Sequence, residues 1–137
     1  MRKSVTDGPP GFIIAVVDDD QRILESLEIL LESADYAVRP FASANALFQS
    51  GCLAEVDCLI SDIGMPLMDG FELIRVVRAE RPELPIILIT GRSGMLDRLS
   101  PIGTDHYRLF KKPFKAQDLL TAVNEALRKP HRRASPL

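Results

Sequence analysis

The sequence predicts an α/β domain, a doubly wound parallel sheet of five strands in a (βα)5 arrangement. Short apolar runs without polar alternation, at residues 12–17 and 85–90, are typical of strands buried on both faces of a parallel sheet. Stretches with apolar residues at helical spacing alternate with these runs along the chain. Because crossovers between parallel strands are right-handed, the helices are expected on both faces of the sheet.

The first expected strand, residues 12–17, ends in three consecutive acids. Asp18 and Asp19 follow the strand directly, and Asp20 is suited to cap a helix over residues 21–34, where apolar residues recur at helical spacing.

The second expected strand, residues 37–41, contains Pro40, and proline favours an edge position in a sheet. Ser43 can cap a short helix after it. The third strand, over residues 57–61, delivers Asp62 to a loop rich in turn residues. The remaining expected elements are a helix over 71–79, a strand over 85–90 that delivers Thr90, an irregular segment over 95–106, a strand over 107–110 that delivers Lys112, and a helix over 115–128.

Length and composition limit the function classes. The 137 residues fit one domain, and 46% hydrophobic with 26% charged residues is ordinary for a globular protein. A formal net charge of -2 gives no reason to expect nucleic acid or a membrane surface as a partner. No apolar run approaches the ~20 residues of a membrane span, and residues 1–11 lack the apolar core of a signal peptide, so we expect a cytoplasmic protein.

The cysteines and histidines predict neither a disulfide nor a catalytic or metal site. Cys58 falls in an expected strand, where a thiol acts as a small buried apolar group, and Cys52 has no histidine nearby. His106 and His131 are far apart in the chain and have no partner that indicates catalysis.

The strand ends carry the side chains of a phosphoryl-transfer site. A doubly wound sheet brings Asp18, Asp19, Asp62, Thr90 and Lys112 to one rim, where ligands bind. Two carboxylates ~4 Å apart repel by about 4 kcal/mol at an effective dielectric of about 20, and a hard divalent cation such as Mg²⁺ relieves this. Lys112 and Thr90 can bind phosphoryl oxygens, and Asp62 is the candidate nucleophile that forms an aspartyl phosphate.

Four motifs in order, over about residues 12–128, resemble the response-regulator receiver domain of two-component signalling. They are Val16-Val17-Asp18-Asp19, Ile60-Ser61-Asp62 with Met65-Pro66 and Asp69-Gly70, Ile89-Thr90-Gly91, and Lys112-Pro113-Phe114. The resemblance implies a flavodoxin-like strand order, 2-1-3-4-5. It also implies that Asp62 accepts a phosphoryl group from a histidine kinase or a histidine phosphotransfer protein, and that the signal leaves through contact with another protein.

The resemblance further implies Mg²⁺ or Mn²⁺ as the metal and no other cofactor. Asp19 and Asp62 would bind the ion directly, together with the backbone carbonyl of Gly64, and Asp18 would help through water. Receivers usually have a cis peptide before the proline, so the resemblance implies one at Lys112-Pro113, although only about 5–6% of peptides before proline are cis in general.

We expect residues 1–11 to form a flexible arm, 12–128 the receiver, and 129–137 a basic tail, with no effector domain in this chain. The protein is expected to be a monomer or a weak homodimer with an unknown downstream protein partner. It is expected to act as a signalling phosphoacceptor that can assist its own phosphorylation and dephosphorylation, not as an enzyme.

Two positions and one segment depart from the family pattern. Gly64 stands where receivers carry side chains that influence dephosphorylation, so we expect an unusual phosphoryl lifetime. Leu109 replaces the aromatic residue that takes part in the family's switch. The 95–106 segment is irregular, so its partner surface cannot be copied from relatives.

Other functions remain open at this point. A pseudo-receiver adaptor would fold in the same way without being phosphorylated. A haloacid-dehalogenase-like phosphatase also uses an Asp nucleophile and Mg²⁺, but it needs an acid at the position of Gly64. A flavodoxin-like FMN carrier has the same topology, but acids at 18–20 would repel its phosphate.

Overall fold

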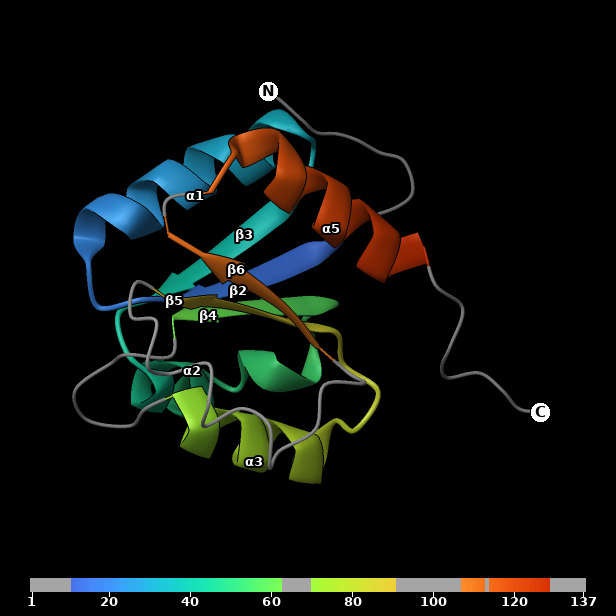
Figure 1. The fold of residues 1–137 in the computed structure, drawn as a ribbon. Coiled ribbons are helices and arrows are strands. Elements are labelled where there is room, and N and C mark those ends of the chain that lie inside the picture. Colours follow the sequence, from blue (N-terminus) through green and yellow to red (C-terminus); the bar gives the residue numbers. More distant parts are fainter. Residues whose placement is uncertain (1–10, 63–69, 91–106, 113, 129–137) are drawn as a thin grey trace.

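The computed structural model describes residues 11–62, 70–90, 107–112 and 114–128. Its strands form one five-stranded sheet in the order β3-β2-β4-β5-β6, and every neighbouring pair is parallel (Figure 1). Counted along the chain, this is the expected order 2-1-3-4-5. The strands are β2 (Ile13–Val17), β3 (Ala37–Phe41), β4 (Cys58–Asp62), β5 (Ile86–Thr90) and β6 (Tyr107–Lys111).

The described helices cover both faces of the sheet, as right-handed crossovers require. In Figure 1, α1 and α5 lie on one face, and α2 and α3 lie on the other. They are α1 (Gln21–Ser33), α2 (Ala44–Ser50), α3 (Gly70–Glu80) and α5 (Ala116–Arg128), and a short 3-10 helix, η1 (Cys52–Ala54), follows α2. The predicted strands and the three long helices agree with these bounds to within one residue at each end, but the sequence did not predict η1.

One apolar core lies on each face of the sheet, because successive strand residues point to opposite faces. The strand residues of the core beneath α1 and α5 are Ile14, Val16, Val38, Cys58, Ile60, Ile87 and Ile89. Those of the core above α2 and α3 are Ala15, Val17, Leu59, Ile86 and Leu88. The unbroken apolar runs of the sequence are therefore strands buried on both sides, as predicted.

Both predicted helix caps are present. The carboxylate of Asp20 accepts a hydrogen bond from the backbone N–H of Arg22 at the start of α1 (2.9 Å). The hydroxyl of Ser43 accepts one from the N–H of Ala46 at the start of α2 (3.0 Å). Each satisfies a donor that the first helical turn leaves without a partner.

Strand β3 forms one edge of the sheet, as Pro40 predicted. Arg39 and Pro40 are both exposed. The N–H of Ala37 donates to Phe12 and the carbonyl of Phe41 accepts from Asp18, so alternate residues of β3 bond to β2 and Pro40 faces the free edge. A proline there removes a donor that another strand could use.

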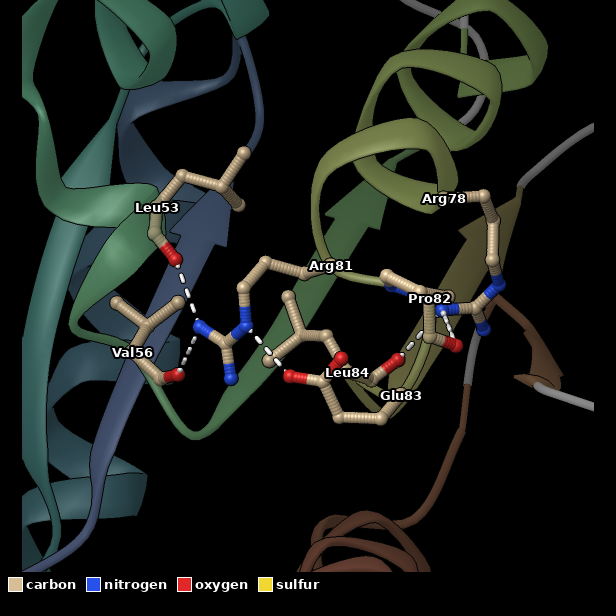
Figure 2. Close-up of polar contacts among 7 residues, drawn as sticks. All are labelled: Leu53, Val56, Arg78, Arg81, Pro82, Glu83 and Leu84. Carbon is tan, nitrogen blue, oxygen red and sulfur yellow. Dashed lines mark hydrogen bonds and ion pairs between the residues drawn. The ribbon is translucent and has the colours of Figure 1, made fainter. Parts of the chain in front are cut away.

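Two arginines donate hydrogen bonds to backbone carbonyls at the end of the sheet where β5 begins. Figure 2 shows the guanidinium of Arg81 between the two segments that it joins. Its Nη1 donates to the carbonyls of Leu53 (2.8 Å) and Val56 (3.1 Å), and its Nε lies 2.7 Å from a carboxylate oxygen of Glu83. Arg78 donates to the carbonyl of Leu84 at 2.7 Å. Carbonyls that precede β4 and β5 thus receive charged donors in place of backbone partners.

Several expectations concern segments outside the described residues. These are the arm before Gly11, the basic tail, the loop with Gly64, the irregular 95–106 segment and the peptide before Pro113. Among the helices that the structure describes, none has the length and apolar character needed to cross a membrane.

Candidate functional site

The predicted site residues lie where their strands end. Asp18 and Asp19 follow the last residue of β2, Asp62 and Thr90 are the last residues of β4 and β5, and Lys112 follows the last residue of β6. Since all five strands are parallel, these positions share the carboxyl edge of the sheet. In open α/β sheets this is the edge where ligands bind.

Three of these residues form an acidic cluster. Asp18, Asp19 and Asp62 each offer one carboxylate oxygen, and these oxygens all lie within 4.8 Å of one another. Asp18 is 1% exposed, Asp62 is 9% exposed, and Asp19 is exposed. The cluster therefore extends from the interior of the protein to its surface, so an ion bound there could keep water ligands on one side.

Asp18 holds the most unfavourable position in the cluster. Its Oδ1 accepts a hydrogen bond from the N–H of Asp20 (2.9 Å), but its buried Oδ2 has no hydrogen-bond partner among the described residues. Burial raises the pKa of Asp18 above its ordinary value, and the charges of Asp62 and Asp19 act in the same direction. The N–H of Asp20 and the ammonium of Lys112 lower that pKa in part.

This donor set fits a hard divalent cation. Mg²⁺ prefers oxygen ligands, and it is bound in proteins by one or two carboxylates together with waters and phosphate oxygens. An ion at the cluster, or a water that it carries, would satisfy the buried Oδ2 of Asp18 and relieve the repulsion among the carboxylates. The carbonyl of Gly64, the expected backbone ligand, lies outside the described residues.

Lys112 and Thr90 are joined through the backbone. The N–H of Lys112 donates to the carbonyl of Thr90 at 2.7 Å, which extends the β5–β6 pairing one step beyond the strand. The side chain of Thr90 is buried, and that of Lys112 is 28% exposed. The Lys112 ammonium lies 3.6 Å from Oδ2 of Asp18, so the predicted lysine does reach the acidic cluster.

Sequence reasoning missed Ser61. Its buried hydroxyl donates to the backbone carbonyl of Asp62 at 3.1 Å. The available signal was a single hydroxyl inside an otherwise apolar strand, because a buried polar group needs a partner.

The family model of the response regulator receiver domain matches residues 14–124. The chain belongs to this family. It is 34% identical over 116 residues to the response regulator protein TmoT of Ectopseudomonas mendocina, a match that covers 85% of this chain and 53% of TmoT. It is 30% identical over 115 residues to the transcriptional regulatory protein FixJ of Bradyrhizobium diazoefficiens, which covers 84% of this chain and 56% of FixJ. This receiver chain thus spans about half the length of these curated relatives.

Solved receiver structures share the fold. A response regulator receiver domain protein from Clostridium thermocellum superposes with a TM-score of 0.76 at 28% identity, covering 85% of this chain and 94% of that one. The signal receiver domain of an HD domain-containing protein from Pseudomonas fluorescens Pf-5 gives a TM-score of 0.76 at 31% identity with the same coverage.

The resemblance seen in the sequence motifs is therefore confirmed. Receivers are signalling phosphoacceptors of two-component systems that work with histidine kinases, and an acidic triad such as Asp18, Asp19 and Asp62 is typical of their Mg²⁺ site. The family assignment gives the phosphatase and the FMN carrier no support.

Proposed function

We propose that Asp62 accepts a phosphoryl group from the phosphohistidine of a histidine kinase or a histidine phosphotransfer protein, in a reaction that depends on Mg²⁺ or Mn²⁺. The observation that carries this proposal is the convergence of the carboxylate oxygens of Asp18, Asp19 and Asp62 within 4.8 Å of one another. Asp62 is the last residue of β4, so it lies at the carboxyl edge of the sheet, where a donor would approach, and its side chain keeps 9% of its surface exposed.

In this proposal a carboxylate oxygen of Asp62 attacks phosphorus while the bond from phosphorus to the donor nitrogen breaks, with the two roughly in line. The bound ion would neutralise charge on the phosphoryl oxygens. Asp19 and Asp62 would hold it directly with the carbonyl of Gly64, and Asp18 would hold it through a water. Lys112, whose ammonium is 3.6 Å from Asp18, would bind one phosphoryl oxygen as a point charge.

Thr90 completes the proposed set. It is the last residue of β5, and its buried hydroxyl would donate one hydrogen bond to the phosphorylated side chain. Residues 12–128 would act as the receiver and would pass the signal to a protein partner. The family and the acidic cluster support this function over that of an adaptor that is never phosphorylated.

The test is incubation with a small-molecule phosphodonor, with Mg²⁺ or with a chelator, followed by the intact mass of the protein. The wild type is expected to gain one phosphoryl group with Mg²⁺ only, and Asp62→Asn is expected to gain none. Asp20→Asn is a matched control: Asp20 is a neighbouring acid whose role is to cap α1, and Asn caps equally well. A wild type that stays unmodified would favour the adaptor.

A further inference from the structure

Ser61 carries the one side chain of β4 that is neither apolar nor part of the acidic cluster. It is fully buried, and in register it lies between Val17 of β2 and Leu88 of β5. An apolar residue would suit this environment better, since an unpaired buried hydroxyl is unfavourable. The hydroxyl does have a partner, the backbone carbonyl of Asp62 at 3.1 Å.

The hydrogen bond from the Ser61 hydroxyl lies at the end of β4, where the regular strand pairing stops. Asp62 is the last residue of the strand, and the β2 pairing ends one residue earlier, with Val17 opposite Ser61. The carbonyl of Asp62 belongs to the peptide that leads out of the strand. A donor on that carbonyl restrains the orientation of this peptide and hence the backbone of Asp62.

Ser61 does not reach the acidic cluster itself. Successive strand residues point to opposite faces, so Ser61 shares its face with Leu59, in the core above α2 and α3. Asp62 shares its face with Ile60, on the side of α1 and α5. Any influence of the Ser61 hydroxyl on the carboxylate of Asp62 must therefore pass through the backbone that the two residues share.

We propose that Ser61 is a positioning residue for the metal site. Its hydroxyl holds the Asp62 carbonyl, and with it the backbone of Asp62, so that the Asp62 carboxylate meets those of Asp18 and Asp19. This inference rests on the proposed function. It adds Ser61 as a residue that acts through Asp62 and does not touch the ion itself.

Mg²⁺ titration by calorimetry of the full chain tests this inference, with the maximal phosphorylation rate as a second readout. Ser61→Ala removes the hydroxyl and should weaken Mg²⁺ binding roughly three- to tenfold, the effect of one neutral hydrogen bond. Ser61→Thr keeps the hydroxyl on a residue suited to strands and should bind Mg²⁺ within about twofold of the wild type.

Ser43→Ala is the control for a merely structural effect, because the Ser43 hydroxyl bonds the N–H of Ala46 at the start of α2 rather than a residue of the acidic cluster, and its loss lowers stability by about 1 kcal/mol in typical cases. It should lower the melting temperature and leave Mg²⁺ affinity unchanged. Wild-type affinity in Ser61→Ala would overturn the inference, as would equal losses in Ser61→Ala and Ser61→Thr. If Ser61→Ala weakens Mg²⁺ binding but the wild type takes up no phosphoryl group, the positioning role stands and the proposed function falls.

Discussion

The ammonium nitrogen of Lys112 lies 3.6 Å from Oδ2 of Asp18, the buried carboxylate oxygen without a hydrogen-bond partner among the described residues. The two residues follow β6 and β2, and β4 and β5 lie between these strands in the sheet. The ion pair therefore joins the ends of two strands that are not neighbours in the sheet. It does not cancel the effects of burial and of the neighbouring carboxylates, since the pKa of Asp18 is still raised.

The first prediction concerns the stability of the metal-free protein. Asp18→Asn keeps an acceptor for the N–H of Asp20 but removes a buried charge from the cluster. In chelator near neutral pH it should stabilise the protein by the order of 1 kcal/mol, because the lost repulsion exceeds the lost attraction to Lys112. Thermal unfolding followed by circular dichroism measures this difference. A variant less stable than the wild type would contradict the account of Asp18.

The same pair of proteins gives the second prediction, on pH. Burial places the folded-state pKa of Asp18 above the ordinary value of 3.8. Ionised Asp18 therefore lowers stability above the folded-state pKa, and this loss disappears as the pH falls through that pKa toward 3.8. The advantage of Asp18→Asn in chelator should shrink as the pH is lowered. A constant gap over that range would mean that Asp18 does not titrate as its burial implies.

The third prediction concerns the arginine bonds at the far end of the sheet. Arg81→Ala leaves the carbonyls of Leu53 and Val56 without their charged donor and should lower the free energy of unfolding by about 1.5–3 kcal/mol. Arg81→Lys should recover only part of this, because an ammonium cannot reproduce the planar fork of donors. Urea unfolding followed by circular dichroism suits a chain without tryptophan.

Arg22→Ala is the matched control for Arg81, because the Arg22 side chain is 91% exposed and its ion pair with Asp20 is long, at 3.7 Å. It should change stability by less than about 0.5 kcal/mol. Equal effects of the two alanine variants would show that the bonds of Arg81 add little.

The fourth prediction concerns the two free thiols. Burial raises the pKa of Cys58 to about 12, so this thiol stays protonated at neutral pH, and the thiolate is the reactive form. A thiol reagent should label Cys52, which is only half-buried, in the native protein and label Cys58 only after unfolding. Peptide mass mapping separates the two sites. Labelling of Cys58 as fast as Cys52 in native buffer would contradict the burial of β4.

The sequence was sufficient for the sheet and for the placement of the acids. Runs such as residues 86–90 are apolar at every position before Thr90, and a short run of this kind bounded by turn residues is typical of a strand covered on both faces. Asp62 could be placed at the rim because the turn residues after it end the strand. Each of these inferences depends on local pattern, which a single sequence contains.

Contacts made through the backbone of distant segments could not be predicted in this way. Arg81 bonds to carbonyls 25 and 28 residues earlier in the chain, and the carboxylate of Asp57 accepts from the N–H of Ile13, 44 residues earlier. The sequence predicts Asp57 as the first residue of a strand. In the structure Asp57 precedes β4, and its carboxylate bonds to the first residue of β2. The sequence pattern of side chains does not show which distant backbone group a side chain will bond to.

The measurement that tests the central claim most directly is the location of the phosphoryl group. Borohydride reduces an acyl phosphate to an alcohol, so a phosphorylated aspartate becomes homoserine, which peptide mass mapping locates. After incubation with a phosphodonor and Mg²⁺, we predict homoserine at position 62, and none there when a chelator replaces Mg²⁺. Homoserine at Asp18 or Asp19, or none at any position, would contradict the account.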